Sequence, residues 1–217
     1  GELMPDSDTV VPALVAALTD DDEFVRAHAR LALKRFGPAI HSQLWAIAGD
    51  IRPVENARRA GAPAGLTPLV SDFAASALAD IPSLDPSPML EDYRAALQRG
   101  RWFGSAAGLA AASDTADFVG SHEHLDSVLR VIFAAPDRAS AAGLARYLSD
   151  DDRRIRGLAS SLLGQATDTS LALPAIRRRM QTAPETEKLQ LVHSLAAGGE
   201  AATSELISML RTGTGDL

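Results

Sequence analysis

Apolar residues recur along this chain at the spacing of α-helices. Between residues 10 and 18 they predict a helix with Pro12 in its first turn, where the missing N–H group costs little. A hydroxyl-bearing residue followed by proline, at 67–68 and at 87–88, predicts two further helix starts. The same periodicity and its interruptions predict other helices at about 22–36, 39–48, 68–79, 88–99, 101–112, 122–135, 152–164 and 201–211.

A short acidic run stands before two of these helices and repeats at a fixed distance. Residues 19–22 (Thr-Asp-Asp-Asp) are followed by Arg26, and 130 residues later 149–152 (Ser-Asp-Asp-Asp) are followed by Arg156. The hydroxyl group that heads each run is expected to cap backbone N–H groups of the next helix, while the carboxylates complement the positive end of its dipole. Each run is therefore a helix start, and Gly37 with the following proline ends the first helix.

Apolar positions around the two acidic runs also match. The pairs are Leu14 and Leu144, Leu18 and Leu148, Ala29 and Ala159, and Leu33 and Leu163. A weaker third copy begins where Leu173-Pro174 opens a helix, and 182–185 replaces the acidic run. Over about 9–37 and 139–211 the chain resembles the HEAT repeat in its bacterial, phycobilisome-lyase-like form. The resemblance implies an α-solenoid, because one helical pair buries its apolar face only against neighbouring pairs.

The stretch between the two clear copies leaves the repeat length open. If 49–66, which is rich in proline and glycine, contains a helix, the period is about 32 residues, and otherwise it is about 43. We expect 49–66 to be an irregular insertion or loop, and 1–8 to be a disordered or tag-derived N-terminus. Residues 1–217 are thus predicted to form a single all-α domain, a right-handed α-solenoid of about five to seven HEAT-like helical-hairpin repeats.

Composition limits the classes of function. Hydrophobic residues make up 46% and charged residues 23%, as in ordinary globular proteins, and the absence of Cys excludes disulfides and thiolate metal sites. No apolar run approaches the roughly 20 residues that span a bilayer. The N-terminal residues are acidic rather than a basic leader, so we expect a cytoplasmic protein with no membrane partner. The excess of Arg over Lys, 19 to 2, is typical of a GC-rich bacterial genome.

Catalytic and cofactor motifs are sparse. His122-Glu123 resembles the His-Glu pairs with which HEAT-like deoxyhypusine hydroxylases bind two irons, but His28, His41 and His193 have no adjacent Glu. There is no phosphate loop, no Gly-x-Ser-x-Gly and no zinc motif. We therefore expect no catalytic residue, no metal and no cofactor, and a metal-dependent enzyme is the third hypothesis in order.

Arginine supplies most of the candidate binding residues. In a solenoid, equivalent positions of the second helices stack into a stripe along the concave face. The predicted stripe consists of Arg26, Arg30, Arg153, Arg156, Ser160, Gln190 and Ser194. Its arginines either contact a partner or pair with the aspartates of adjacent turns as an internal ladder. The consecutive Arg177–Arg179 point about 100° apart around a helix, so we expect them to be solvated.

These residues predict a non-enzymatic protein-interaction or scaffolding module that binds a partner protein or peptide on its concave face. The alternative is nucleic-acid binding, as in the HEAT-like DNA glycosylases that hold duplex DNA in a basic concave groove. Arg52 with 58–59 and the aromatic pair 102–103 are further candidates for that alternative. The net charge of −7 argues against broad nucleic-acid binding, because phosphate neutralisation needs a basic surface.

Overall fold

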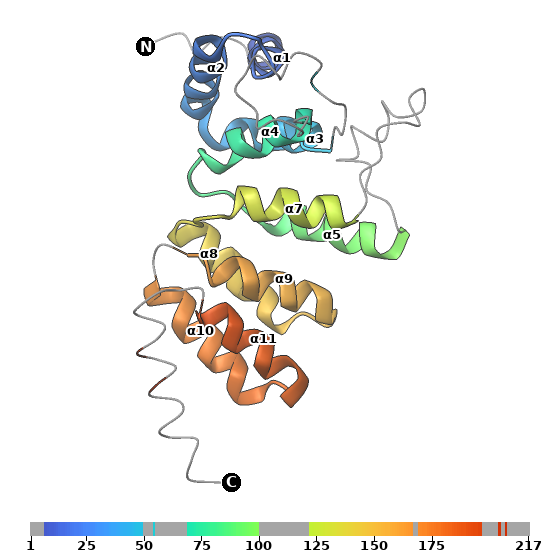
Figure 1. Ribbon diagram of the computed structural model, residues 1–217, viewed down its shortest axis with the longest axis vertical. Coiled ribbons are helices and arrows are strands. Elements are labelled where there is room, and N and C mark those ends of the chain that lie inside the picture. Colours follow the sequence, from blue (N-terminus) through green and yellow to red (C-terminus); the bar gives the residue numbers. More distant parts are fainter. Residues whose placement is uncertain are drawn as a thin grey trace. The chain divides into compact units, whose positions relative to one another are not determined.

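The elements of the structure are helical, which confirms the all-α prediction for the residues described (Figure 1). The computed structural model describes residues 7–49, 54, 69–99, 122–166, 169–196, 204 and 207. Several predicted segments lie outside them: residues 1–6 of the N-terminal tail predicted over 1–8, nearly all of the insertion at 49–66, the helix at 101–112 with its aromatic pair, and most of the helix at 201–211. The prediction of a tail is wrong for residues 7 and 8, which are helical. Within the described residues, no helix is both long and apolar enough to cross a bilayer.

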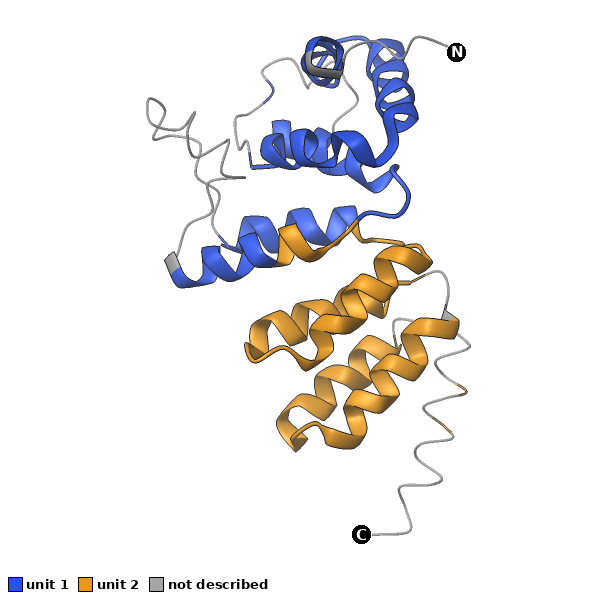
Figure 2. Ribbon diagram, turned by 180° about the vertical axis from the view of Figure 1, so that it is seen from behind, with its two compact units in different colours: residues 1–84, 91–132 blue, residues 85–90, 133–217 orange. Residues whose placement is uncertain are grey.

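The chain divides into two compact units, which Figure 2 distinguishes by colour. Unit 1 comprises residues 1–84 and 91–132, and unit 2 comprises 85–90 and 133–217. The described helices of unit 1 are α1 (Ser7–Ala17), α2 (Glu23–Phe36), α3 (His41–Ile47), α4 (Val70–Ala79) and α7 (His122–Ile132), with a 3₁₀ turn η1 (Gly37–Ile40) after α2. Helix α5 (Ser87–Arg99) begins in unit 2 and ends in unit 1.

In unit 1, α1 packs on α2, α3 on α4, and α4 on α7. Trp45 of α3 anchors this core: its side chain is buried, and its indole Nε1 donates a hydrogen bond of 2.7 Å to Asp92 Oδ2. Gly37 ends α2 in the left-handed region, with φ of +60°, as its sequence predicts.

Unit 2 shows the stacking of helical hairpins most clearly. Its helices are α8 (Arg138–Arg146), α9 (Arg153–Leu163), α10 (Thr169–Thr182) and α11 (Glu185–Ala196), with a 3₁₀ turn η4 (Tyr147–Ser149) before α9. Each hairpin pairs its own helices, α8 with α9 and α10 with α11, and the two hairpins stack α8 on α10 and α9 on α11 (Figure 1). The buried side chains between them are aliphatic, among them Leu144, Ile155, Leu162, Ile176 and Leu195.

The two acidic runs fold alike, but their caps differ from the prediction. The N-cap residue of α2 is Asp22, whose Oδ1 accepts the Phe24 N–H at 2.8 Å. Asp152 caps α9 in the same way, with 2.8 Å to the Arg154 N–H. The hydroxyl cap predicted for Thr19 is wrong, because Thr19 Oγ1 donates instead to Ala16 O, in the turn that closes α1.

The positions of two prolines also correct the sequence prediction. Pro12 lies five residues after Ser7, the first residue of α1, and Pro174 lies five residues after Thr169, the first of α10. Neither proline therefore stands in the first turn. Both prolines lie inside their helices, at the same distance from the first residue.

Removing the α2 cap is expected to cost about 1 kcal/mol of unfolding free energy, because Asp22→Ala leaves a backbone N–H without its acceptor. The matched control is Asp21→Ala, which removes the same charge next to the cap position and is expected to cost a few tenths of a kcal/mol at most. Urea unfolding followed by circular dichroism measures both. Equal losses would show that the carboxylate acts through general electrostatics rather than as a cap.

Candidate functional site

The repeated arginines hold the acidic turns in place. Arg26 Nη1 donates to the main-chain oxygens of Asp20 and Asp21, at 2.8 and 3.1 Å. Arg156 Nη1 donates to the corresponding oxygens of Asp150 and Asp151, at 2.7 and 3.0 Å. Of the two roles that the sequence left open for these arginines, the structure supports the internal one, although the aspartates accept through their main-chain carbonyl oxygens and not through their carboxylates.

Arg156 also belongs to an ion-pair triad inside unit 2, which we call the Glu187 triad (Arg156, Arg179 and Glu187). Glu187 of α11 is buried, and its carboxylate lies 2.9 Å from Arg156 Nη2 and 2.7 Å from Arg179 Nε. The hydrogen bonds from Arg179, and next from Arg156, lower the pKa of Glu187 against the opposing effect of burial. The solvated position expected for Arg179 is therefore wrong, whereas Arg177 and Arg178 are exposed.

Three further residues of the predicted stripe lie between helices α9 and α11. Ser160 and Ser194 are buried, and their hydroxyl oxygens lie 3.2 Å apart in a hydrogen bond. Gln190 packs toward α9, where a Cβ atom added at Gly157 would meet its side-chain amide. The prediction that the two serines line an open surface is wrong, because the close approach of α9 and α11 covers that side of both helices.

The remaining stripe residues are Arg30 and Arg153. Arg30 Nη2 forms an ion pair of 2.6 Å with Asp80 Oδ2, which follows α4 in unit 1. Arg153, at the start of α9 in unit 2, is exposed. The seven residues are therefore divided between the two units, and the side chains of five of them form hydrogen bonds or ion pairs within their own unit.

The histidines near the start of α7 do not join a larger ligand set. His122 Nε2 lies 3.0 Å from Glu123 Oε1, a contact between neighbours in sequence. Burial lowers the pKa of His124, and the nearby Asp72 carboxylate acts in the opposite direction. Among the residues that the structure describes, no three His, Asp or Glu side chains come together in a way that could hold a metal ion.

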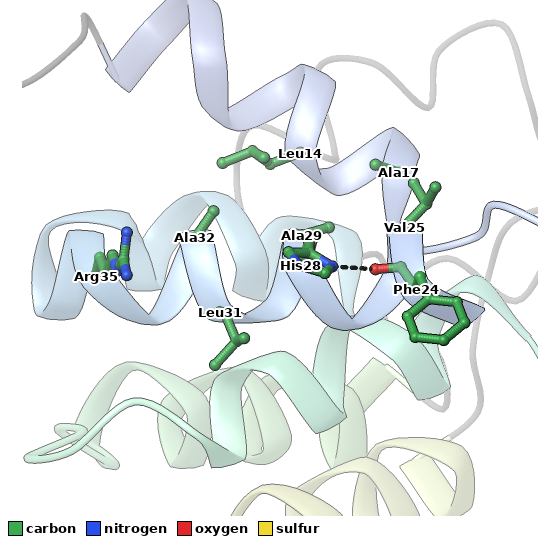
Figure 3. Close-up of a pocket in the computed structure, with 9 residues that line it drawn as sticks. All are labelled: Leu14, Ala17, Phe24, Val25, His28, Ala29, Leu31, Ala32 and Arg35. Carbon is green, nitrogen blue, oxygen red and sulfur yellow. Dashed lines mark hydrogen bonds between the residues drawn. The ribbon is translucent and has the colours of Figure 1, made fainter. Parts of the chain in front are cut away.

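A site that the sequence did not predict lies along the first hairpin. We call it the α1/α2 groove, an open hollow of about 600 Å³ on α2 beside α1 (Figure 3). Its polar side chains are His28 and Arg35, and the others are apolar. The full lining is Leu14, Ala17, Phe24, Val25, His28, Ala29, Leu31, Ala32 and Arg35.

The two most exposed apolar side chains of α2, Phe24 and Leu31, form the outer part of this groove. Phe24 is 76% exposed and Leu31 is 58% exposed. In Figure 3 both lie on the side of α2 that faces away from α1, whereas Val25 and Ala32 point toward it. His28 stands between Phe24 and Leu31, and its Nδ1 makes a 2.7 Å hydrogen bond with Phe24 O. Apolar side chains this exposed on a helix mark a surface that another molecule can cover.

Helix α9, the copy of α2 at an offset of 130 residues, carries the opposite pattern. Where α2 has the exposed Phe24 and Leu31, α9 has the polar Arg154 and Ser161. Conversely, the α9 residues that match Val25, His28 and Ala32 are all buried. They are Ile155, Leu158 and Leu162. The α1/α2 groove is thus a property of the first hairpin and not of the repeat itself.

A sequence signal for the groove was present in the differences between the two copies. Positions 24 and 31 are large and apolar in one copy and polar in the other. The arginines at 26 and 156 are shared by the two copies and therefore form a visible repeat, whereas positions 24 and 31 differ between the copies and belong to no shared pattern. No protein-family model matches the chain, and no curated protein matches it either.

Proposed function

We propose that this chain is a non-enzymatic protein-interaction module whose docking surface is the α1/α2 groove. The observation that carries the proposal is the exposure of Phe24 and Leu31 beside that groove, at positions where the second copy is polar. An amphipathic helix of a partner protein fits such a surface, because its apolar residues at positions i, i+3 or i+4, and i+7 match a helix-long groove.

The same proposal includes the wider architecture. A right-handed α-solenoid of about five to seven HEAT-like repeats is supported by the stacked hairpins of unit 2 and by the matching arginine hydrogen bonds to the acidic turns before α2 and α9. A cytoplasmic location, and a bacterial source for the chain, remain predictions from the sequence.

The contacts of the arginines favour this function over nucleic-acid binding. Phosphate recognition needs guanidinium groups that are open to the ligand. The guanidinium groups of Arg26 and Arg156 already donate hydrogen bonds to main-chain oxygens, and Arg30 forms an ion pair with Asp80. An apolar groove beside a run of aspartates is also a poor surface for a polyanion.

A selected peptide provides the test of the docking surface. The probe is the tightest binder from a displayed library of amphipathic helical peptides selected on the full chain, with affinity measured by fluorescence anisotropy. Phe24→Arg combined with Leu31→Ser gives α2 the residues of α9 and is expected to weaken binding at least about tenfold, because both apolar contacts are lost.

The matched control is Leu189→Ser on α11, which removes another exposed leucine, 64% exposed, away from the groove. We expect it to change the peptide affinity by less than about twofold. The proposal is wrong if the library yields no peptide above background, or if the chosen peptide binds the double variant as well as the original chain.

A further inference from the structure

We propose that the partner of the α1/α2 groove is α2 of a second copy of this chain, packed antiparallel about a two-fold axis. This inference rests on the proposed function and names the partner of the same surface. It follows from the order of side chains along α2, which complements itself when the helix is reversed.

The spacing of the side chains along the exposed stripe of α2 is the same in both directions. Phe24, His28, Leu31 and Arg35 are separated by four, three and four residues, so they lie on one face of the helix. Reversing a second copy about the middle of this stripe places Phe24 opposite Arg35 and His28 opposite Leu31. Every contact then occurs twice, as a two-fold interface requires.

The two kinds of contact are favourable. Arg35 can lie over the face of the opposing Phe24 ring, a cation–π arrangement. Leu31 is covered by the opposing imidazole of His28, whose Nδ1 is already occupied by Phe24 O. The residues that flank the stripe, Ala27 and Ala32, are small and allow the two helices to approach closely.

The charges at the two ends of α2 are also complementary in the antiparallel pair. The acidic run 20–23 precedes and opens the helix, and Lys34 and Arg35 lie in its last turn, all of them exposed. Within one helix this polarity favours the dipole. Between two reversed copies it also brings each acidic end to a basic end, with Glu23 beside Lys34 of the other copy.

Helix α9 shows that this pattern is not general to the repeat. It begins with Arg153 and Arg154, and the positions equivalent to Lys34 and Arg35 are Gly164 and Gln165. Two reversed copies of α9 would place no opposite charges at their ends. A contact of one helix per copy is small compared with the roughly 1,600 Å² of a standard interface, so we expect a weak, concentration-dependent dimer.

Complementary charge reversals test the arrangement on the full chain. The acidic-end variant is Asp21→Lys with Glu23→Lys, which leaves the cap Asp22 intact, and the basic-end variant is Lys34→Glu with Arg35→Glu. Sedimentation velocity is run on each protein across a hundredfold range of concentration that reaches the sub-millimolar range. The original chain is expected to shift from one to two chains per particle, and each variant alone is expected to stay monomeric.

The decisive sample is an equimolar mixture of the two variants. In a mixed pair the reversed acidic end of one chain meets the reversed basic end of the other, so dimers are expected to return. A monomeric original chain, dimers that persist in both variants, or a mixture that remains monomeric would each overturn the proposal. Unchanged far-ultraviolet circular dichroism verifies that the variants are folded.

The outcome is separable from that of the proposed function. If the chain is monomeric but the selected peptide binds and is lost in the Phe24→Arg, Leu31→Ser variant, the groove is a docking surface for another protein and the second copy is the wrong occupant. If neither dimers nor peptide binding is found, both proposals fail.

Discussion

Replacing Glu187 with alanine is expected to lower the unfolding free energy by about 3 kcal/mol, because it leaves Arg156 and Arg179 without their shared carboxylate. The side chains of these arginines are only 15% and 17% exposed, so water compensates little for the lost partner. Because unit 2 is small, this corresponds to a fall of about 15 °C in the midpoint of its thermal unfolding, measured by circular dichroism.

The matched control lies two residues away on the same helix. Glu185 pairs with Lys188 at 2.6 Å, but its side chain is 85% exposed, and Glu185→Ala is therefore expected to change the midpoint by no more than about 2 °C. Equal losses in the two variants would show that the Glu187 triad contributes no more than a surface ion pair.

The Glu187 triad also makes the free energy of unfolding depend on pH. Its hydrogen bonds lower the pKa of Glu187 in the folded state relative to an unfolded value of about 4.5. A carboxylate of this kind stabilises the fold fully above the unfolded pKa, and the stabilisation is lost as the pH falls below that value. The difference in stability between the original chain and Glu187→Gln is therefore expected to shrink below about pH 4.5. A difference that stays constant from pH 7 to pH 3 would contradict this.

Gly164→Ala is expected to be nearly as damaging, at about 2–3 kcal/mol, because the added methyl group would meet the main-chain oxygen of Ser194 on α11. Backbone atoms cannot move aside without shifting the helix. The measurement is the free energy of unfolding in urea.

Gly157→Ala, inside α9, is the control for the change at Gly164, the residue that follows this helix. Its added methyl group would meet the terminal amide of Gln190, which can rotate away, and alanine gains about 1 kcal/mol of helix propensity over glycine. We expect its stability to stay within about 1 kcal/mol of that of the original chain. If Gly157→Ala proves the more harmful of the two, the close approach of α9 and α11 is not limited by the backbone at Gly164.

The local features of the fold were predictable from sequence, because they depend on neighbours along the chain. The first acidic run and Gly37 lie at the two ends of α2, at the expected residues. The identity of the cap was missed, since a pattern of hydroxyl and acidic residues does not reveal which oxygen reaches the first free N–H. Here the third aspartate reaches it, and the hydroxyl of Thr19 turns back to α1.

The candidate site was harder to predict, because it depends on which helix faces are covered. The repeat pattern predicts that Ser160 and Ser194 occupy matching positions, and in the structure their hydroxyl groups form a hydrogen bond across α9 and α11. The pattern could not show that this side is closed. Glu187 was missed because its partners lie 31 and 8 residues away in the sequence, and no local pattern connects them.

The thiol reactivity of a single cysteine placed in the α1/α2 groove tests the central claim most directly. The chain has no native Cys, so His28→Cys provides one thiol in the groove, and Leu189→Cys provides one on α11 as the reference. The rate of reaction with a small disulfide reagent is measured in dilute protein, in concentrated protein and with the selected peptide in excess. If the groove is a docking surface, the thiol at position 28 reacts severalfold more slowly once an occupant is present, while the thiol at position 189 reacts at an unchanged rate. Equal rates at position 28 under all three conditions would contradict the account.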